Sequence, residues 1–292
     1  MNEPSPIPIA VRMDWPRPLA FALSGGGSYG AAQVGMIRAL LEHGIVPDLV
    51  VGVSVGALNG ALLAARPDSA VTELVDLWSR IDRRTIFGSN PFGLVRNLVR
   101  DGALCRPSLL GSLIDDHLHA RTFADLLVPF AAVVTEASTG APELLTSGHL
   151  RTALLASAAI PGVFSRVTIG DREFLDGGVS ANVPIRQAIA FGASTVISLD
   201  PSPSTPPSAF PGRIVGGLPR SVNLMIRNQQ AHDVKELTDR YTVVSIPSVT
   251  PGDVSSFDFT ATARLVEASY ESTVAAISHW TPSPRPCPET AR

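Results

Sequence analysis

The first 65 residues alternate between short apolar runs and helix-like segments, and this alternation constrains the fold more than any other feature. Leu19 to Leu23 and Leu49 to Val53 are apolar runs of strand length. Residues 29–43 carry apolar side chains at helical spacing, and residues 57–65 are apolar and favour helix. A strand–helix–strand–helix order predicts a parallel sheet covered by helices.

The same alternation continues to the end of the chain. Further strands are predicted at 130–134, 172–175, 195–199 and 241–246, and further helices at 71–81, 150–158, 185–191, 221–237 and 261–278. With 45% hydrophobic residues the chain can fill a sizeable core. We therefore expect an α/β protein with three α/β/α layers and a mainly parallel central sheet. The predicted organisation is a flexible segment over 1–17, one domain over 18–280 and a disordered, proline-rich tail over 281–292.

Charge and the chain start exclude several classes of protein. A formal net charge of -3 gives no electrostatic reason to expect nucleic acid as a partner. The start of the chain lacks the basic and apolar regions of a secretory signal, and no run of 18 apolar residues predicts a membrane-spanning helix. We expect a cytoplasmic protein with no more than transient contact at a membrane surface. The oligomeric state is left open.

A candidate nucleophile stands between the second predicted strand and the helix after it, in the sequence Gly52-Val53-Ser54-Val55-Gly56. A sharp strand-to-helix turn of this G-x-S-x-G kind lifts the serine hydroxyl above the sheet edge. Glycines two residues on either side remove side chains that would clash there, and the following helix directs its N-terminus at developing negative charge. The alternative is an ordinary turn in which Ser54 caps the helix.

A glycine-rich loop, Ser24 to Gly30, joins the first strand to the first helix. Such a loop exposes backbone N–H groups that bind anions. The glycines at 25, 27 and 30 also satisfy G-x-G-x-x-G, which favours a dinucleotide site if an acid ends the second strand. The nearest acid, Asp48, precedes that strand, and Ser54 stands where the acid belongs. We therefore favour an oxyanion hole formed beside the candidate nucleophile.

The candidate base is a carboxylate rather than a histidine. None of the six histidines sits in a glycine-marked turn after a strand in the chain order that a Ser–acid–His triad requires. Asp176 does stand at the end of a predicted strand, followed by Gly177 and Gly178. Burial would raise the pKa of this carboxyl and make it a better base. The alternative is a simple Asp-Gly turn.

These elements, in this order, resemble the patatin-like phospholipase family. The matching stretches are Ser24 to Gly30, Gly52 to Gly56, Asp176 to Pro184 and a fourth segment, Ala156 to Phe164. The likeness covers about residues 18–200. One departure is Tyr29, where the family usually has an arginine or lysine, and this departure bears on the binding of anionic headgroups.

The resemblance implies a patatin-like fold and a Ser54–Asp176 dyad that works without histidine. It implies hydrolysis of lipid acyl esters of the phospholipase A or lysophospholipase type, with a lipid substrate and no metal or cofactor. The backbone N–H groups of Gly25, Gly26 and Gly27 would form the oxyanion hole. The glycines that would support the motifs are Gly30, Gly52, Gly56, Gly177 and Gly178.

Two segments and two other classes of function remain open. Residues 86–104 are interpreted either as an interfacial segment that meets lipid or as an amphipathic helix covering the core. Residues 201–219 are either a lid or a plain linker. A nucleotide-binding module built on Gly25 to Gly30 and an inactive scaffold, for which Tyr29 is the single hint, are the alternatives to an enzyme.

Overall fold

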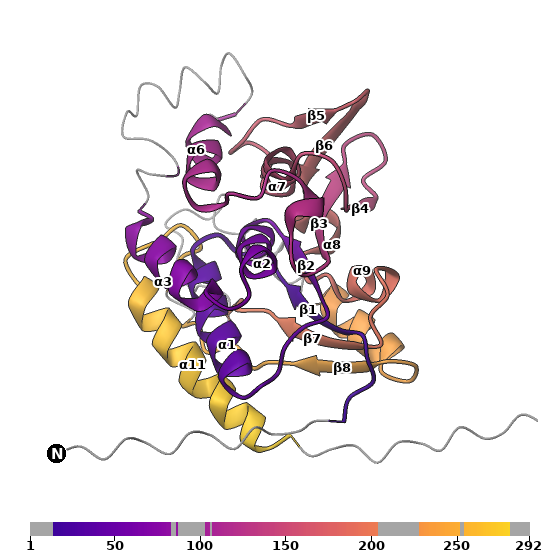
Figure 1. Ribbon diagram of the computed structural model, residues 1–292. Coiled ribbons are helices and arrows are strands. Elements are labelled where there is room, and N and C mark those ends of the chain that lie inside the picture. Colours follow the sequence, from indigo (N-terminus) through magenta and orange to yellow (C-terminus); the bar gives the residue numbers. More distant parts are fainter. Residues whose placement is uncertain are drawn as a thin grey trace, which may run out of the picture.

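The computed structural model describes residues 14–82, 86, 103–105, 107–203, 228–251 and 254–280. These residues form an eight-stranded sheet in the order β5-β6-β3-β2-β1-β7-β8, with β4 paired to β3 (Figure 1). The strands are β1 (Leu19–Leu23), β2 (Leu49–Val53), β3 (Phe130–Glu136), β4 (Pro142–Leu145), β5 (Val167–Ile169), β6 (Arg172–Asp176), β7 (Thr195–Leu199) and β8 (Thr242–Ser245).

Helices connect the strands and cover the sheet. They are α1 (Gly30–Glu42), α2 (Val55–Ala65), α3 (Ala70–Arg80), α6 (Pro107–His117), α7 (Leu150–Ser157), α8 (Gly178–Ala181), α9 (Ile185–Ala190) and α11 (Thr262–Ser278), with 3-10 turns η1 (Gly27–Tyr29) and η2 (Phe123–Asp125). Residues 228–237 are also helical.

The central strands confirm the predicted class. β1 pairs in parallel with β2 and β7, β2 with β3, and β7 with β8. Every residue of β1, β2 and β7 is buried, because both faces of the sheet are covered. The three predicted strands at 19–23, 49–53 and 195–199 agree with the structure to the residue.

The two faces of the sheet contribute to separate cores, which makes three layers. The odd-numbered side chains of β1 pack with residues from α1, α2, α3 and α11. The even-numbered side chains of β1 pack with α9 and with the helical residues 228–237. In Figure 1, α1, α3 and α11 lie on one side of β1 and α9 lies on the other.

One edge of the sheet is antiparallel, and this edge positions the candidate base. β3 pairs in antiparallel fashion with both β4 and β6. Residues 132 and 133 of β3 pair with both β2 and β4, while 134 and 135 pair with both β4 and β6. Since a strand has two edges, β2 and β6 must follow one another along the same edge of β3. Val53 lies opposite Val133, and Asp176 lies opposite Val134, so the two strand ends meet.

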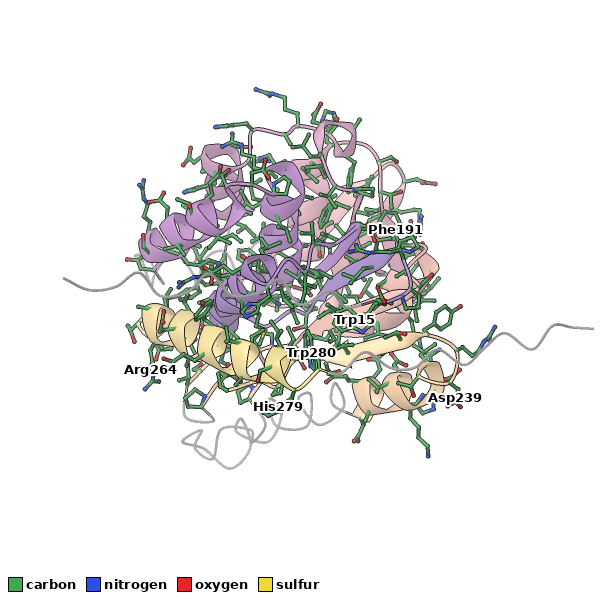
Figure 2. The ribbon with its side chains drawn as sticks, turned by 60° about the horizontal axis from the view of Figure 1, so that its bottom comes forward. Trp15, Phe191, Asp239, Arg264, His279 and Trp280 are labelled. Atoms are coloured by element: carbon green, nitrogen blue, oxygen red, sulfur yellow. The ribbon has the colours of Figure 1, made fainter. Side chains whose placement is uncertain are left out.

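Several predicted segments lie wholly or largely outside the described residues. These are the terminal segments 1–13 and 281–292, most of 86–104, residues 204–219 and the first part of the predicted helix 221–237. The described residues that precede residue 18 contact the rest of the domain. Trp15 lies next to Trp280 (Figure 2), with 5.3 Å between the ring centroids. The Thr195 hydroxyl donates a hydrogen bond to Pro16 O at 2.7 Å. None of the described helices combines the length and apolar character needed to cross a bilayer.

Candidate active site

Ser54 lies in a strained turn between β2 and α2. Its backbone has φ 54° and ψ -122°, and it is the one non-glycine residue with positive φ in the described part of the chain. A conformation of this kind costs about 1–3 kcal/mol and persists only where the surrounding structure enforces it. Ser54 occupies the N-cap position of α2, yet its hydroxyl makes no capping hydrogen bond. The side chain is therefore not explained as an ordinary helix cap.

The flanking glycines are required by close backbone approach. A β-carbon at Gly52 would lie 2.4 Å from Gly56 O. A β-carbon at Gly56 would lie 2.4 Å from Leu23 O and 2.5 Å from Ser24 O. Gly52 therefore lets β2 turn closely into α2, and Gly56 lets the elbow pack directly against the end of β1, where the glycine-rich loop begins.

Asp176 ends β6 in a buried position next to that elbow. The residue is 5% exposed, and its Oδ1 accepts a hydrogen bond from Gly178 N at 2.7 Å. Burial raises the pKa of Asp176 from 3.8 to about 6, while the Ser54 hydroxyl and the Gly178 N–H favour the charged form and lower it in part. Oδ2 is buried and has no partner of good hydrogen-bond geometry among the described residues. This oxygen is the one free to accept a proton. In the absence of substrate, hydrogen bonds between catalytic groups are often long or poorly aligned, and they tighten only when substrate binds.

The amides of the glycine-rich loop are not all free. Gly25 N donates to Asn182 O at 3.1 Å, and Ser28 N donates to Ser256 O at 2.8 Å. In the described part of the chain, the N–H groups of Gly26 and Gly27 have no acceptor. The structure therefore leaves Gly26 and Gly27 as the available donors, and it engages Gly25 in holding the loop to the segment that follows Asp176.

Tyr29 belongs to the protein interior rather than to a headgroup site. Its side chain is buried and its hydroxyl donates a hydrogen bond to Val254 O at 2.7 Å. Burial also raises the pKa of Tyr29 to about 12, so the phenol stays neutral. The tyrosine therefore ties the glycine-rich loop to the segment that begins at Val254.

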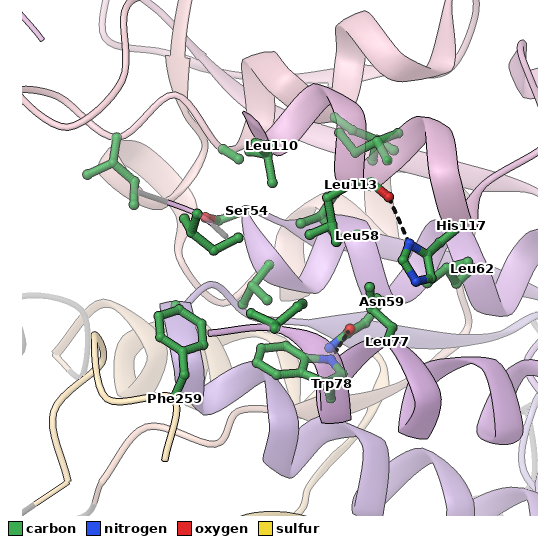
Figure 3. A pocket seen from close by; sticks show the side chains of 18 of the residues that line it. Ser54, Leu58, Asn59, Leu62, Leu77, Trp78, Leu110, Leu113, His117 and Phe259 are labelled. Atoms are coloured by element: carbon green, nitrogen blue, oxygen red, sulfur yellow. Dashed lines mark hydrogen bonds between the residues drawn. The ribbon is translucent and has the colours of Figure 1, made fainter. Parts of the chain in front are cut away.

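An apolar cavity, open at its mouth, extends from Ser54 and Gly27 (Figure 3). Its walls come from α2, α3, α6 and α7 and from residues 256–259, and they include Leu58, Leu62, Leu77, Trp78, Leu113 and Phe259. His117 also lines the cavity, but it lies on the opposite side from Ser54 in Figure 3, with Nδ1 3.0 Å from Leu113 O. Such a cavity suits an alkyl or acyl chain. The sequence did not predict α6 and so missed this wall.

The histidines and Asp48 take no part in the geometry around Ser54. Where the chain is described, neither Ser54 nor Asp176 has a histidine as hydrogen-bond partner. Asp48 accepts a hydrogen bond from Leu19 N at 2.6 Å and pairs with Arg17 at 2.8 Å. It therefore lies at the amino ends of the parallel strands, opposite to the glycine-rich loop, where it could not hold the ribose of a nucleotide bound at that loop.

Fold and site together define a class: three-layer α/β proteins with a strained serine at a strand-to-helix elbow. Within that class, the family model described as patatin-like phospholipase matches residues 21–189. This match covers more than half of the chain, and the chain belongs to the patatin-like phospholipase family.

Individual relatives agree with this assignment. The patatin-like phospholipase domain-containing protein ZK370.4 of Caenorhabditis elegans is 31% identical over 188 residues, which are 62% of this chain and 13% of that protein. Lysophospholipase NTE1 of Mycosarcoma maydis is 27% identical over 188 residues, which are 62% of this chain and 10% of that protein. The chain thus matches only a small part of these much longer relatives. The crystal structure of VipD from Legionella pneumophila shares the fold, with a TM-score of 0.53 and 16% identity over 90% of this chain and 67% of that one.

Proposed function

We propose that this protein hydrolyses acyl esters of lipids, with Ser54 as nucleophile and Asp176 as base. The observation that carries the proposal is the meeting of two strand ends along one edge of β3. The strained Ser54 follows one end, and the buried Asp176 forms the other. No histidine is needed, because a carboxyl with a pKa of about 6 is a better proton acceptor than an ordinary aspartate.

The reaction begins when Asp176 Oδ2 takes the proton from the Ser54 hydroxyl and Oγ attacks the ester carbonyl. The N–H groups of Gly26 and Gly27 stabilise the negative charge on the carbonyl oxygen. The ester bond breaks as the proton passes from Asp176 to the leaving alcohol, which leaves an acyl group on Ser54. Asp176 then takes a proton from water, the hydroxide attacks the acyl group, and Ser54 regains its proton as the fatty acid leaves.

The cavity supports a substrate with one long apolar chain. Its lining is almost wholly apolar, and among the described residues no lysine or arginine lines it. An acyl chain in the cavity could place its carbonyl near Ser54, which lines the cavity together with Gly27 and lies across it from His117 (Figure 3). The name of the Mycosarcoma maydis relative, lysophospholipase NTE1, supports the same class of substrate.

The proposal predicts a dependence on acyl-chain length. Each methylene group that enters the cavity contributes up to about 0.8 kcal/mol, or about four-fold in kcat/KM, until the cavity is full. We expect kcat/KM for p-nitrophenyl esters to rise steeply from acetate to longer chains. The half-buried Leu58 lines the cavity, so Leu58→Phe should move the optimum to shorter chains, whereas Leu127→Phe, at an exposed site outside the cavity, should not.

Two results would count against the proposal. A flat profile that neither variant changes would show that the cavity does not hold the acyl chain. No hydrolysis above the buffer rate by the wild-type protein, on any ester of the series or on a lysophospholipid, would contradict the function itself and favour the inactive scaffold.

A further inference from the structure

The C-terminal end of α7 lies between the Ser54 elbow and the Asp176 turn. Its last residue, Ser157, is fully buried. The Ser157 hydroxyl accepts a hydrogen bond from Ser54 N at 2.9 Å and donates one to Val133 O at 2.7 Å. Ser54 and Val133 lie at the point where β2 ends and β6 becomes the neighbour of β3. The Ser157 hydroxyl therefore bridges the end of β2 and the adjacent residue of β3.

The backbone of the same helix end holds the base. Ser157 O accepts a hydrogen bond from Gly177 N at 3.3 Å, and Ala159 O accepts one from Asp176 N at 3.0 Å. The hydroxyl of Ser157 therefore contacts the nucleophile's side of the junction, while its carbonyl contacts the base's side. Ser157 therefore contacts both sides of the junction between Ser54 and Asp176.

We propose that Ser157 is a positioning residue, whose hydroxyl fixes the Ser54 peptide and thereby directs the Ser54 hydroxyl at Asp176. The proposal rests on the function proposed above. It follows from the backbone conformation of Ser54, which persists only if its surroundings enforce it. The N–H of Ser54 is the group through which the neighbouring helix can do so.

The chemistry of this position suits a hydroxyl. A hydroxyl can accept from an N–H and donate to a carbonyl at once. An alanine at position 157 would do neither, so the buried Ser54 N–H would lose its acceptor and Val133 O would lose the hydroxyl that donates to it. The Ser54 peptide could then rotate away from its strained conformation, and a displacement of about 1 Å in a reacting group can cost on the order of 100-fold in rate.

The test compares Ser157→Ala with Ser157→Thr, which keeps the hydroxyl, and with Ser198→Ala as a matched control. Ser198 is also fully buried, but its hydroxyl has no partner in the described part of the chain. The concentration of active sites is first measured by titration with a fluorophosphonate, so that kcat refers to folded protein. We expect kcat for a p-nitrophenyl ester to fall about 10- to 100-fold in Ser157→Ala with KM nearly unchanged. Ser157→Thr should recover most of this loss, and Ser198→Ala should match the wild type.

The pH profile separates positioning from a merely structural role. The Ser54 hydroxyl helps to lower the pKa of Asp176, so its misplacement in Ser157→Ala should move the acidic limb of the profile to higher pH. The inference is overturned if Ser157→Ala loses thermal stability but keeps the kcat and acidic limb of the wild type. It is equally overturned if a folded Ser157→Thr is as slow as Ser157→Ala. Absence of wild-type hydrolysis would instead contradict the proposed function, and the inference with it.

Discussion

Replacing Ser54 by alanine should lower kcat for ester hydrolysis on the order of 10⁴-fold while hardly changing thermal stability. The loss follows because no other group at the elbow can carry the acyl chain. The stability should persist because the Ser54 hydroxyl caps no helix, and alanine meets the same positive φ. Ser54→Gly removes that backbone strain and should be more stable than Ser54→Ala by about 1 kcal/mol.

Initial rates and melting temperatures of the two Ser54 variants, with Ser198→Ala as the control for loss of a buried hydroxyl, measure both effects. Retention of more than about 1% of the wild-type rate by Ser54→Ala would remove Ser54 from the role of nucleophile.

Replacing Asp176 by asparagine should have opposite effects on activity and stability. Loss of the base should lower kcat on the order of 10³-fold. The pKa of Asp176 lies at about 6 in the folded protein, above the ordinary value of 3.8. The stability that protonated Asp176 contributes is therefore fully present below pH 3.8 and is lost as pH rises through about 6. At pH 8 the ionised carboxylate costs about 3 kcal/mol, which a neutral asparagine avoids.

Three measurements check this prediction. The melting temperature of Asp176→Asn should exceed that of the wild type at pH 8, and the difference should shrink at pH 4.5. The kcat of the wild type should fall as pH drops below about 6, because the base becomes protonated. A variant less stable than the wild type at pH 8 would show that burial does not raise the pKa of Asp176, and one with wild-type activity would show that Asp176 is not the base.

The buried parallel strands could be predicted from the sequence because each is a short run of mainly apolar and β-branched residues that ends at turn-forming residues. β1, β2 and β7 agree to the residue for this reason. The residues at the strand ends were also identified from local patterns. Ser54 stands between a strand and a helix, and Asp176 stands at a strand end before two glycines. The family match supports the likeness that these motifs indicated.

The contacts between distant segments could not be predicted in the same way. β4 and β5 are short and partly exposed, so they lack the apolar signal of the central strands. The position of β6 next to the end of β2 depends on the register of both strands on β3. Asn182 O engages the Gly25 amide, and Ser157 engages the Ser54 amide. Both residues lie in segments that were notable only for their resemblance to the patatin-like phospholipase family. Hydrogen bonds between backbone groups far apart in the chain leave no local sequence pattern from which these contacts could be predicted.

The most direct test of the dyad is covalent labelling of the native protein by a fluorophosphonate, followed by tryptic digestion and mass spectrometry. Cleavage after Arg38 and Arg80 releases peptide 39–80, because trypsin does not cut the Arg66–Pro67 bond, and fragment ions distinguish a label on Ser54 from one on Ser69, Thr72 or Ser79. The account predicts that the label lies on Ser54, and that Asp176→Asn slows its attachment at least about 100-fold. A label on another peptide, or an unchanged labelling rate in Asp176→Asn, would contradict the pairing of Ser54 with Asp176.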